Sequence, residues 1–485
     1  MPAAVRVLGG WGIAALLAAC AAGPDYHRAA ADVPPAWQPT ELWHEAVPSD
    51  AKLKGNWWEL FQDPDLNPLV EKALVGNQNL RVAAARLEQA RDQLTIARSG
   101  LFPAVDLSST ALRTKVSANR PLSEYSVPNQ SIVQNDFRIG PSVTYEVDLF
   151  GRVRRDVEGA RASAEQAEAD FENTRLVLMA TLVTDYYSLR ENDAEIEVLR
   201  RSLDLERNAL TFVTSRHDLG FATGLDLAQQ EALLEASTTQ LELLQVQRSQ
   251  FEHAIATLVG IPAPSFSLAP VSYAPPLPAF PLGLPSDLLQ RRPDVAAAER
   301  AMAAANARIG VARAAYYPSI NLAPVLGVPN AGFESNTLST LLEAPSRFWA
   351  IGLSATQLLF DAGKTRANVR FADADYSAAV ATYRQTVLAA MEEVENGITG
   401  LGSLDRAAVS ADASVRSAQR AFDIASDRYK GGVDTYLDVI TAEQVLLINQ
   451  RQAVQIQGQQ FVTAVFLVKA LGGGWSAAPQ VSRSN

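Results

Sequence analysis

The chain has 485 residues, of which 48% are hydrophobic and 20% are charged, a composition typical of a folded protein with a large core. It contains 42 Lys and Arg residues against 53 Asp and Glu residues, so its formal net charge is -11. An acidic chain without a basic cluster is a poor ligand for phosphate backbones, so we expect no nucleic-acid partner. The sequence has no repeated apolar runs of about 20 residues, which excludes a polytopic helical membrane protein.

Residues 1–20 have the pattern of a lipoprotein precursor. Arg6 is followed by an apolar stretch and by a Leu-Ala-Ala-Cys sequence that ends at Cys20, which is typical of a lipobox and predicts a signal peptide over residues 1–19. Cys20 would then start the mature chain and carry covalent lipid, palmitate included, and several acyl chains attach a protein firmly. An ordinary signal peptide that contains a cysteine is the alternative. Ala21 follows, where an Asp would resemble an inner-membrane retention signal, so the outer membrane is favoured.

Prolines divide the mature chain. Residues 20–54 are rich in proline and predict an extended N-terminal strap. No proline occurs from Ser142 to Ile261 or from Ser346 to Ala478, whereas residues 262–285 hold eight. We therefore predict a linker over residues 262–285. It separates a first repeat over 55–261 from a second repeat over 286–475, and residues 476–485 form a C-terminal tail.

The two long segments are copies of one unit. The sequence from Leu80 to Leu107 matches that from Val295 to Leu322 at a numbering offset of 215. Farther on, several residues between Arg216 and Glu231 match residues between Arg428 and Glu443 at an offset of 212. Alanine-rich helices could imitate the first match but not the second, which lies in a glycine-containing turn. Each copy is expected to contain a helix, a hairpin of two strands, a very long helix, a tight turn and another helix.

The very long helices are expected at about Arg152–Arg216 and Thr365–Tyr429. Apolar side chains recur in both at spacings of three and four residues, which predicts a coiled-coil seam. At 1.5 Å per residue each helix would be about 100 Å long. In the first helix the seam is interrupted by the polar residues Asp185, Asn192 and Glu206.

The strands are indicated by alternation of apolar and polar residues, most clearly from Phe137 to Leu149. We expect four strands, at about 104–116, 137–149, 319–328 and 348–359, joined by polar stretches at 117–135 and 329–346. Their length and alternation suit transmembrane β-strands. A sheet packed on the helices is the alternative. In a membrane, a polar face would line water with Arg138, Glu146 and Asp148, and an apolar face would meet lipid with Phe137, Val143, Tyr145 and Val147.

With these features the chain resembles the TolC-like outer-membrane factors, in particular the lipoprotein branch that serves multidrug (RND-type) efflux systems. The local marks are Tyr145–Arg155, Arg291–Val295, Leu359–Lys364 and Arg428–Asp438. The resemblance implies a mainly α fold with transmembrane β-structure, in which long coiled-coil helices form an α-barrel tunnel. It also implies a trimer whose chains each contribute four strands to a shared 12-stranded β-barrel. Four strands cannot close alone in lipid, and this argument allows two copies as well as three.

The resemblance further implies a passive exit channel for small molecules in a tripartite efflux pump. It would lie in the outer membrane with a periplasmic extension, bind a periplasmic adaptor (membrane fusion) protein, and depend on an inner-membrane transporter for energy. A type I protein-secretion channel is the alternative within the family. Outside it, the alternatives are a structural periplasmic lipoprotein and a periplasmic lipoprotein enzyme.

No catalytic pattern supports an enzyme. The four histidines have no metal-ligand spacing, and no GxSxG sequence occurs. Gly363-Lys364 follows a predicted strand, but Leu358 occupies the place of the first glycine of a phosphate-binding loop. We therefore expect no enzymatic activity, no metal and no cofactor other than the covalent lipid.

The resemblance assigns two groups of site residues. The turns at the periplasmic tip would meet the adaptor through Gly220, Thr223, Gly224, Gly431, Gly432 and Thr435, although glycine also simply ends helices. The tunnel would be closed by a periplasmic gate formed by Asp434, Tyr436 and Asp438. Three copies of a carboxylate around one axis repel each other and attract cations. The alternative role of either aspartate is to complement the dipole of the following helix.

Overall fold

The computed structural model describes residues 21–30, 34, 56–119, 131–271, 292–322 and 329–473. The expected signal peptide, Cys20, most of the N-terminal strap and the C-terminal tail lie outside these residues, as do residues 272–285 of the expected linker. The chain divides into two compact units, each built from segments of both repeats. Unit 1 comprises residues 1–29, 87–167 and 298–383, and unit 2 comprises residues 30–86, 168–297 and 384–485.

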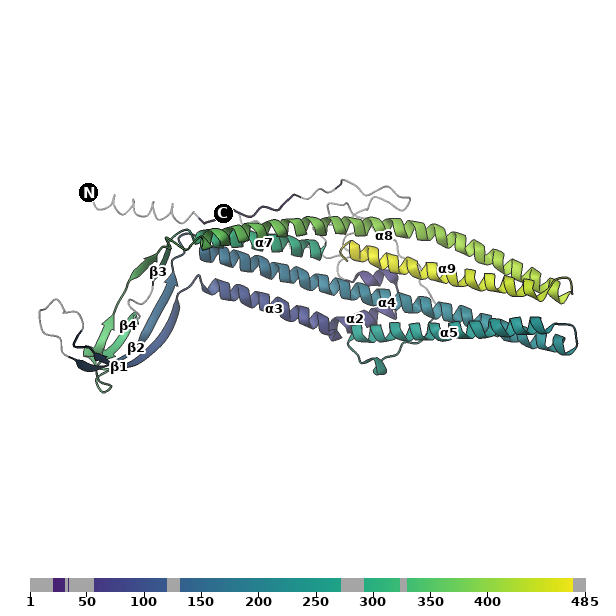
Figure 1. Cartoon of the computed structure of the whole chain (residues 1–485), viewed down its shortest axis with the longest axis horizontal. Helices are drawn as coiled ribbons and strands as arrows, with labels where there is room; N and C mark the ends of the chain where they lie inside the picture. Colours follow the sequence, from purple (N-terminus) through teal and green to yellow (C-terminus); the bar gives the residue numbers. More distant parts are fainter. Residues whose placement is uncertain are drawn as a thin grey trace. The chain divides into compact units, whose positions relative to one another are not determined.

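Helices make up most of the described chain (Figure 1). They are η2 (Trp57–Phe61), α2 (Leu66–Gly76), α3 (Gln78–Ser99), α4 (Arg152–Asp218), α5 (Gly224–Val259), η3 (Ala263–Ser265), α7 (Pro293–Ala314), η5 (Ala344–Ser346), α8 (Lys364–Lys430) and α9 (Tyr436–Ala470). The helices α4 and α8 have 67 residues each, which confirms the expected very long helices. Among the helices of the described ranges, none has an apolar stretch long enough to cross a membrane.

The helices of the two repeats have matching bounds. Both ends of α7 follow the ends of α3 at the offset of 215. Both ends of α8 follow those of α4 at the offset of 212, and the start of α9 follows the start of α5 at the same offset. The two sequence offsets therefore correspond to two structural copies of one unit, which confirms the predicted repeat.

Each very long helix follows a strand after a short connection, and an aspartate in that connection caps it. The carboxylate of Asp148 accepts hydrogen bonds from the backbone N–H groups of Val153 and Arg154, both at 2.9 Å. The carboxylate of Asp361 accepts one from the backbone N–H of Thr365 at 2.7 Å. These bonds satisfy N–H groups that have no partner in the first turn of a helix. The aspartates thus cap the equivalent first turns of α4 and α8, although Asp361 lies one position farther along its repeat than Asp148.

The strands form one antiparallel sheet within unit 1. They are β1 (Ala104–Val116), β2 (Ile132–Glu146), β3 (Ser319–Leu322), β4 (Ala331–Ser335), β5 (Arg347–Trp349) and β6 (Leu353–Thr356). Strand β2 pairs with β1 along one edge, from Ala104 opposite Thr144 to Val116 opposite Ile132. Along its other edge it pairs with β3 and then β4, which pair in turn with β6 and β5. The sheet therefore has four antiparallel segments side by side, two from each repeat.

The expected bounds of the second strand are wrong at both ends. Strand β2 begins at Ile132, inside the stretch expected to be a connection, because residues 132–136 pair with β1 although their sequence does not alternate. It ends at Glu146 because Asp148 has a left-handed backbone, with φ of 50°, and serves as the cap of α4. Asp148 is therefore not a strand residue on the polar face of the sheet.

The second hairpin also differs from expectation. Strand β4 lies in the polar stretch 329–346 that was expected to be a connection, and it forms because β2 offers a partner edge. The expected third strand is β3 up to Leu322, and residues 323–328 lie outside the described part of the chain. The expected fourth strand is divided into β5 and β6, and residues 357–359 follow it without ladder pairing.

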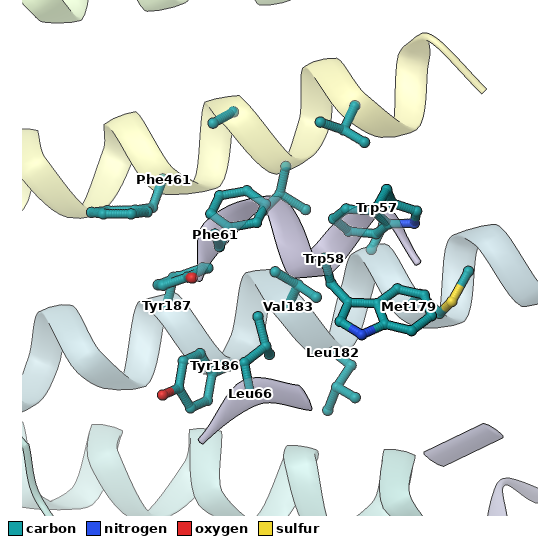
Figure 2. Packing of buried hydrophobic residues seen from close by; sticks show 14 of the residues in the cluster. Trp57, Trp58, Phe61, Leu66, Met179, Leu182, Val183, Tyr186, Tyr187 and Phe461 are labelled. Carbon is teal, nitrogen blue, oxygen red and sulfur yellow. The ribbon is translucent and has the colours of Figure 1, made fainter. Parts of the chain in front are cut away.

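The main hydrophobic core lies in unit 2, around the aromatic residues of η2. Trp57 and Phe61 are fully buried there among side chains of α2, α4, α5, α8 and α9. Figure 2 shows the rings of Phe61, Tyr187 and Phe461 close together, and the ring centroids of Tyr187 and Phe461 are stacked 4.6 Å apart. The hydroxyl of Tyr186 donates a hydrogen bond to Asp63 at 2.9 Å. The short helix η2 thus connects helices of both repeats.

The burial of Phe61 predicts that shortening its side chain strongly destabilises the protein. The substitution Phe61→Ala should lower the free energy of unfolding by about 3–5 kcal/mol, because a buried ring is lost and a cavity is left. Thermal unfolding in detergent, followed by tryptophan fluorescence, should show a lower midpoint. The control is Phe221→Ala, because Phe221 is 72% exposed. Equal midpoints for the two variants would contradict the proposed central role of η2.

Candidate functional site

The strand-to-helix junction of repeat 1 holds the start of the described chain. The backbone N–H of Ala22 donates to the carbonyl of Phe150 at 2.9 Å. Arg155, on the first turns of α4, donates to the carbonyl of Ala22 at 3.3 Å and to the carboxylate of Asp25 at 2.8 Å. Cys20 itself lies outside the described residues. Ala21, the first described residue of the segment, follows it directly in the sequence.

This N-terminal segment, Ala21–Arg28, lies against α4 and α7, and its last residue, Arg28, contacts Tyr383 of α8. The side chain of Asn306 donates to the carbonyl of Pro24 at 3.0 Å, and Tyr26 hydrogen-bonds to Glu299. A Cβ atom added to Gly310 would lie 2.8 Å from the carbonyl oxygen of Ala22, so only glycine leaves room here. Tyr26 also packs against a cluster of buried alanines, Ala162, Ala303 and Ala304. The segment therefore packs closely against small side chains of α4 and α7.

The two helical hairpins of unit 2 end in turns of the same type. Gly220 and Gly432 have positive φ angles of 78° and 76°. Next to them, the N–H groups of Phe221 and Val433 donate to the carbonyls of Arg216 and Arg428, five residues earlier. These are Schellman motifs, in which glycine accommodates the left-handed backbone. The two turns are related by the offset of 212, so the helical hairpins of both repeats have the same type of turn.

The helices after both turns begin with a threonine and an aspartate. The carboxylate of Asp226 accepts from the backbone N–H of Thr223 at 2.8 Å, and Asp438 accepts from the hydroxyl of Thr435 at 2.7 Å. These residues form capping boxes, which satisfy donors at the start of a helix. Gly224 is the first residue of α5, and Gly431 follows the last residue of α8. The expected tip residues therefore all lie in or beside the two turns.

The three expected gate residues make separate contacts within the chain. Asp434 accepts a hydrogen bond from Arg428 at 2.8 Å, and this bond holds the pKa of the carboxyl below its usual value. Asp438 belongs to the capping box. Tyr436 is buried, and its hydroxyl donates to the side chain of Gln230 at 2.6 Å. The structure thus brings the three residues to one tip, and their role as a gate stays a prediction.

Aromatic residues connect the two tips. Tyr429 and Tyr436, on the second hairpin, lie 5.0 Å apart between ring centroids and pack with Val213 and Leu233 of the first hairpin. The guanidinium of Arg216 lies 4.9 Å from the ring centroid of Tyr429. A cation above an aromatic face is attracted by the ring. The two hairpins therefore share one small core next to their turns.

Two buried glutamates lie behind this small core. The carboxylate of Glu206 on α4 accepts hydrogen bonds from Ser202 at 3.1 Å and Ser237 at 2.8 Å. Its other oxygen has no hydrogen-bond partner among the described residues. Burial raises the pKa of Glu206, and burial together with the charge of Glu206 raises the pKa of Glu443 to about 7. Glu443 also lines a cavity of about 400 Å³ between α4, α8 and α9.

The polar groups of the tips serve to hold helices together. Within the described ranges, no group of three or more His, Cys, Asp and Glu side chains is placed to hold a metal ion. The side chains described above are instead used in helix caps, one ion pair and hydrogen bonds between helices. This arrangement fixes the helices at the tips.

A match to a protein-family model shows which family the chain belongs to. The model of the family described as Outer membrane efflux protein matches residues 69–261 and 284–473, one match for each repeat. The chain belongs to this family. This efflux protein is accordingly an outer-membrane channel of an efflux pump and has no enzymatic role. Its mainly helical TolC-like fold with two repeats agrees with the resemblance noted in the sequence.

Similar proteins cover nearly all of this efflux protein. The toluene efflux pump outer membrane protein TtgF of Pseudomonas putida is 32% identical over 468 residues, or 95% of each chain. The pyoverdine export outer membrane protein OpmQ of Pseudomonas aeruginosa is 31% identical over 466 residues, or 96% of each chain. The solved outer-membrane channel OprN has a TM-score of 0.85 at 31% identity and covers 94% of this chain and 100% of its own. The Campylobacter jejuni CmeC channel has a TM-score of 0.83 at 25% identity and covers 94% of this chain and 96% of its own.

The buried glutamates of this efflux protein were not predicted as site residues. Glu206 interrupts the apolar seam of the first long helix, and Glu443 is one of the marks that identify the repeat. A polar residue in an apolar seam was the available signal. The seam alone could not show that α5 supplies Ser237 to Glu206, because that contact joins residues 31 positions apart.

The raised pKa of Glu443 predicts a dependence of stability on pH. The ordinary pKa of 4.5 rises to about 7 in the folded protein, so the folded state holds a proton that the unfolded state has lost. Stability should therefore fall as pH rises from about 4.5 to 7, by roughly 3 kcal/mol. Glu443→Gln, which stays uncharged, should raise the thermal midpoint at pH 8 and change it little near pH 4.

The control for this experiment is Glu231→Gln. Glu231 occupies the position equivalent to Glu443 in the first repeat, but its side chain is exposed. Its substitution should leave the midpoint unchanged at both pH values. A stabilisation by Glu443→Gln that is the same at both pH values would show that ionisation of Glu443 is not the cause.

Proposed function

We propose that this efflux channel is the passive exit duct of a tripartite pump. It would carry small molecules from the periplasm to the exterior, while an inner-membrane transporter supplies the energy. The observation that carries this proposal is the repeated unit, in which a strand hairpin is followed, after a short connection, by a 67-residue helix with an exposed turn at its end. The names of relatives that export toluene and pyoverdine support small molecules as the cargo.

We infer that three copies of the chain form the duct. Within the described residues, the outer edges of β1 and of β5 and β6 have no strand partner. Unpaired backbone groups facing lipid are costly, so further copies must continue the sheet. Two copies of four strand segments would give eight and three would give twelve. The family resemblance favours the trimer, and the long helices of each copy would continue it into the periplasm.

Covalent lipid at Cys20 is a further part of the proposal. The segment that follows Cys20 is bound to the junction between β2 and α4 by the hydrogen bond from Ala22 to Phe150. A lipid on Cys20 would therefore start at the level where the strands end. Acyl chains that start where membrane-spanning strands end would enter the bilayer beside them, so anchor and sheet would support each other.

The tips are proposed to dock a periplasmic adaptor. Besides the expected residues Gly220, Thr223, Gly224, Gly431, Gly432 and Thr435, they carry exposed apolar side chains on both hairpins. These are Leu219, Phe221, Leu225, Val433 and Leu437. Exposed apolar groups near one another are typical of protein contacts. The two turns have one backbone geometry, so an adaptor could meet both with the same surface.

We also propose that Asp434, Tyr436 and Asp438 close the tip until the adaptor binds. The ion pair of Asp434 with Arg428 and the burial of Tyr436 hold the second turn in its present conformation. Movement of this turn would have to break both contacts. In a trimer, the negative charges would occur three times around the axis and favour cations.

The closure proposal predicts a change in conductance. Asp434→Ala and Asp438→Ala, singly and together, should raise the single-channel conductance in planar bilayers, because ion pairing, capping and charge at the turn are lost. Asp226→Ala is the matched control, since Asp226 forms the capping box of the first repeat. It should leave conductance unchanged. Unchanged conductance in the double variant would contradict the proposal that these residues close the tip.

Native mass spectrometry tests the duct itself. Protein extracted from outer membranes in mild detergent should have the mass of three chains that start at Cys20 and carry lipid. Cys20→Ala should abolish the added lipid mass, with export affected less than sorting or assembly. A water-soluble monomer from the wild-type chain would overturn the proposed function.

A further inference from the structure

One contact between helices of unit 2 joins the two repeats through polar side chains. It lies between α4 of the first repeat and α9 of the second. At one end the carboxylate of Glu191 lies so close to Gly458 that an added Cβ atom would collide with it. Nearer the tip, Glu206 and Glu443 are close enough for the charge of one to affect the other. Between these two pairs α4 advances 15 residues and α9 returns 15, so one antiparallel register holds along the contact, which we name the α4–α9 seam.

The α4–α9 seam contains more carboxylates than cations. Glu195 of α4 accepts hydrogen bonds from Arg451 at 3.0 Å and from Gln455 at 2.6 Å, both on α9. Arg451 also donates to Gln240 of α5 at 2.8 Å. Among the described residues, its guanidinium is the one bonded to any of the four seam carboxylates, which belong to Glu191, Glu195, Glu206 and Glu443.

Neighbouring helices do not supply the missing positive charge. From α5, the hydroxyl of Ser237 donates to Glu206 at 2.8 Å. From α8, Asp412 lines the same cavity as Glu443 and adds a further acid. Tyr436 of α9 is neutral, because burial and nearby carboxylates raise its pKa. Acids and neutral groups therefore face Glu206 and Glu443 from these three helices.

The arginines of α4 near the seam are bonded to other acids. Arg201 and Arg207 are exposed, and each donates to an acid one turn away on the same helix. Arg190 donates to Asp193 at 3.1 Å. The charge of Arg207 lowers the pKa of Glu206, but burial raises it by more. These cations therefore do not balance the buried carboxyls.

Two of the four carboxyls have pKa values near neutrality. Burial and the charge of Glu195 raise the pKa of Glu191 to about 7. Burial and the charge of Glu206 raise the pKa of Glu443 to the same value. Within the described ranges, neither carboxylate accepts a hydrogen bond or forms an ion pair. Both carboxyls therefore hold protons below about pH 7, whereas an ordinary glutamate ionises near pH 4.5.

The acids of the seam are not part of the repeated plan of the long helices. At the offset of 212, the three seam glutamates of α4 correspond to Ser403, Ala407 and Ala418 of α8. These residues are small and uncharged, although α8 has the same length as α4. A long helix of this fold therefore forms without buried carboxyls, which indicates that those of α4 have a role besides forming the helix.

We propose that the α4–α9 seam is a proton-dependent contact, which holds the two helical hairpins together at acidic pH and loosens as Glu191 and Glu443 lose their protons. With both protonated, the pair of Glu195 and Arg451 is balanced. With both ionised, like charges stand beside Glu195 and Glu206 where charge is costly. Separation would expose the carboxyls to water and return their pKa values toward 4.5, so it releases protons and is favoured as the pH rises through about 7.

The cavity beside Glu443 gives the proton access to the seam. It has a volume of about 400 Å³, and its polar lining includes Ser202, Gln419 and Gln450. A polar cavity of this size has room for several water molecules. Protons can therefore exchange with Glu443 while the helices stay in contact. Because the seam lies within one chain, its response to pH does not depend on the number of copies in the duct.

Labelling of a cysteine placed in the seam tests this proposal. Leu199 is fully buried on α4, where it packs with Leu244 of α5 and Leu447 of α9. A Leu199→Cys thiol should therefore react with N-ethylmaleimide only when the hairpins separate. The rate is measured by mass spectrometry on the full chain in detergent, with the wild-type glutamates and with Glu191→Gln, Glu443→Gln. Comparison at equal pH cancels the ionisation of the thiol itself.

The two backgrounds should differ at high pH only. At pH 8 the thiol should react at least about tenfold faster with the wild-type glutamates, and near pH 5.5 the two rates should agree within about twofold. Glu231→Gln, Glu235→Gln is the matched control, because it removes two exposed charges from α5, and it should follow the wild type. Ile196→Cys, from the same buried cluster, is a second probe. Equal rates at pH 8, or a ratio that is the same at both pH values, would overturn the proposal.

Conductance in planar bilayers shows whether the seam serves the exit duct, and this readout rests on the proposed function. Between pH 5.5 and 8 the conductance of the wild-type channel should rise at least about threefold more than that of the Glu191→Gln, Glu443→Gln variant. Equal pH dependence of the two channels, together with labelling rates that differ, would exclude the seam from control of the duct. A wild-type chain without conductance would overturn the duct, whereas the labelling rates would still decide on the seam.

Discussion

Strand β2 is the element on which the arrangement of unit 1 depends, because it is hydrogen-bonded along both edges. Its pairing with β1 closes the first hairpin, and its pairing with β3 and β4 joins the first repeat to the second. Directly after it, Asp148 starts α4 and Phe150 binds the N-terminal segment. Pairing along one strand therefore determines how sheet, long helix and N-terminal segment meet.

The two repeats share a backbone plan but differ in chemistry at their tips. Both turns use glycine with positive φ and a capping box of threonine and aspartate. Only the second repeat has an aspartate paired with its arginine, since the position equivalent to Asp434 is Ala222. In the first repeat Arg216 instead lies over the ring of Tyr429. The duplicated scaffold thus carries an arginine–aspartate ion pair at the turn of the second hairpin and a cation–aromatic contact of the equivalent arginine in the first.

Two buried glutamates make the helix contacts of unit 2 sensitive to pH. Glu206 and Glu443 lie among apolar side chains of α4, α5 and α9, where a charge is costly. Their raised pKa values mean that both hold protons more firmly than exposed glutamates. A fully apolar seam would be more stable. Around η2, by contrast, aromatic rings fill the core.

Local features of the sequence determined the repeat, the very long helices and the glycine turns. Each depends on residues close in sequence, such as the apolar spacing of α4 or the glycine of a Schellman motif. Tertiary structure decided the ends of β2, the presence of β4 and the burial of Glu206 and Tyr436. Residues 132–136 and 331–335 lack the alternation that predicts strands, and they are strands because a partner edge satisfies their backbone. Such contacts join distant residues, and no local pattern records them.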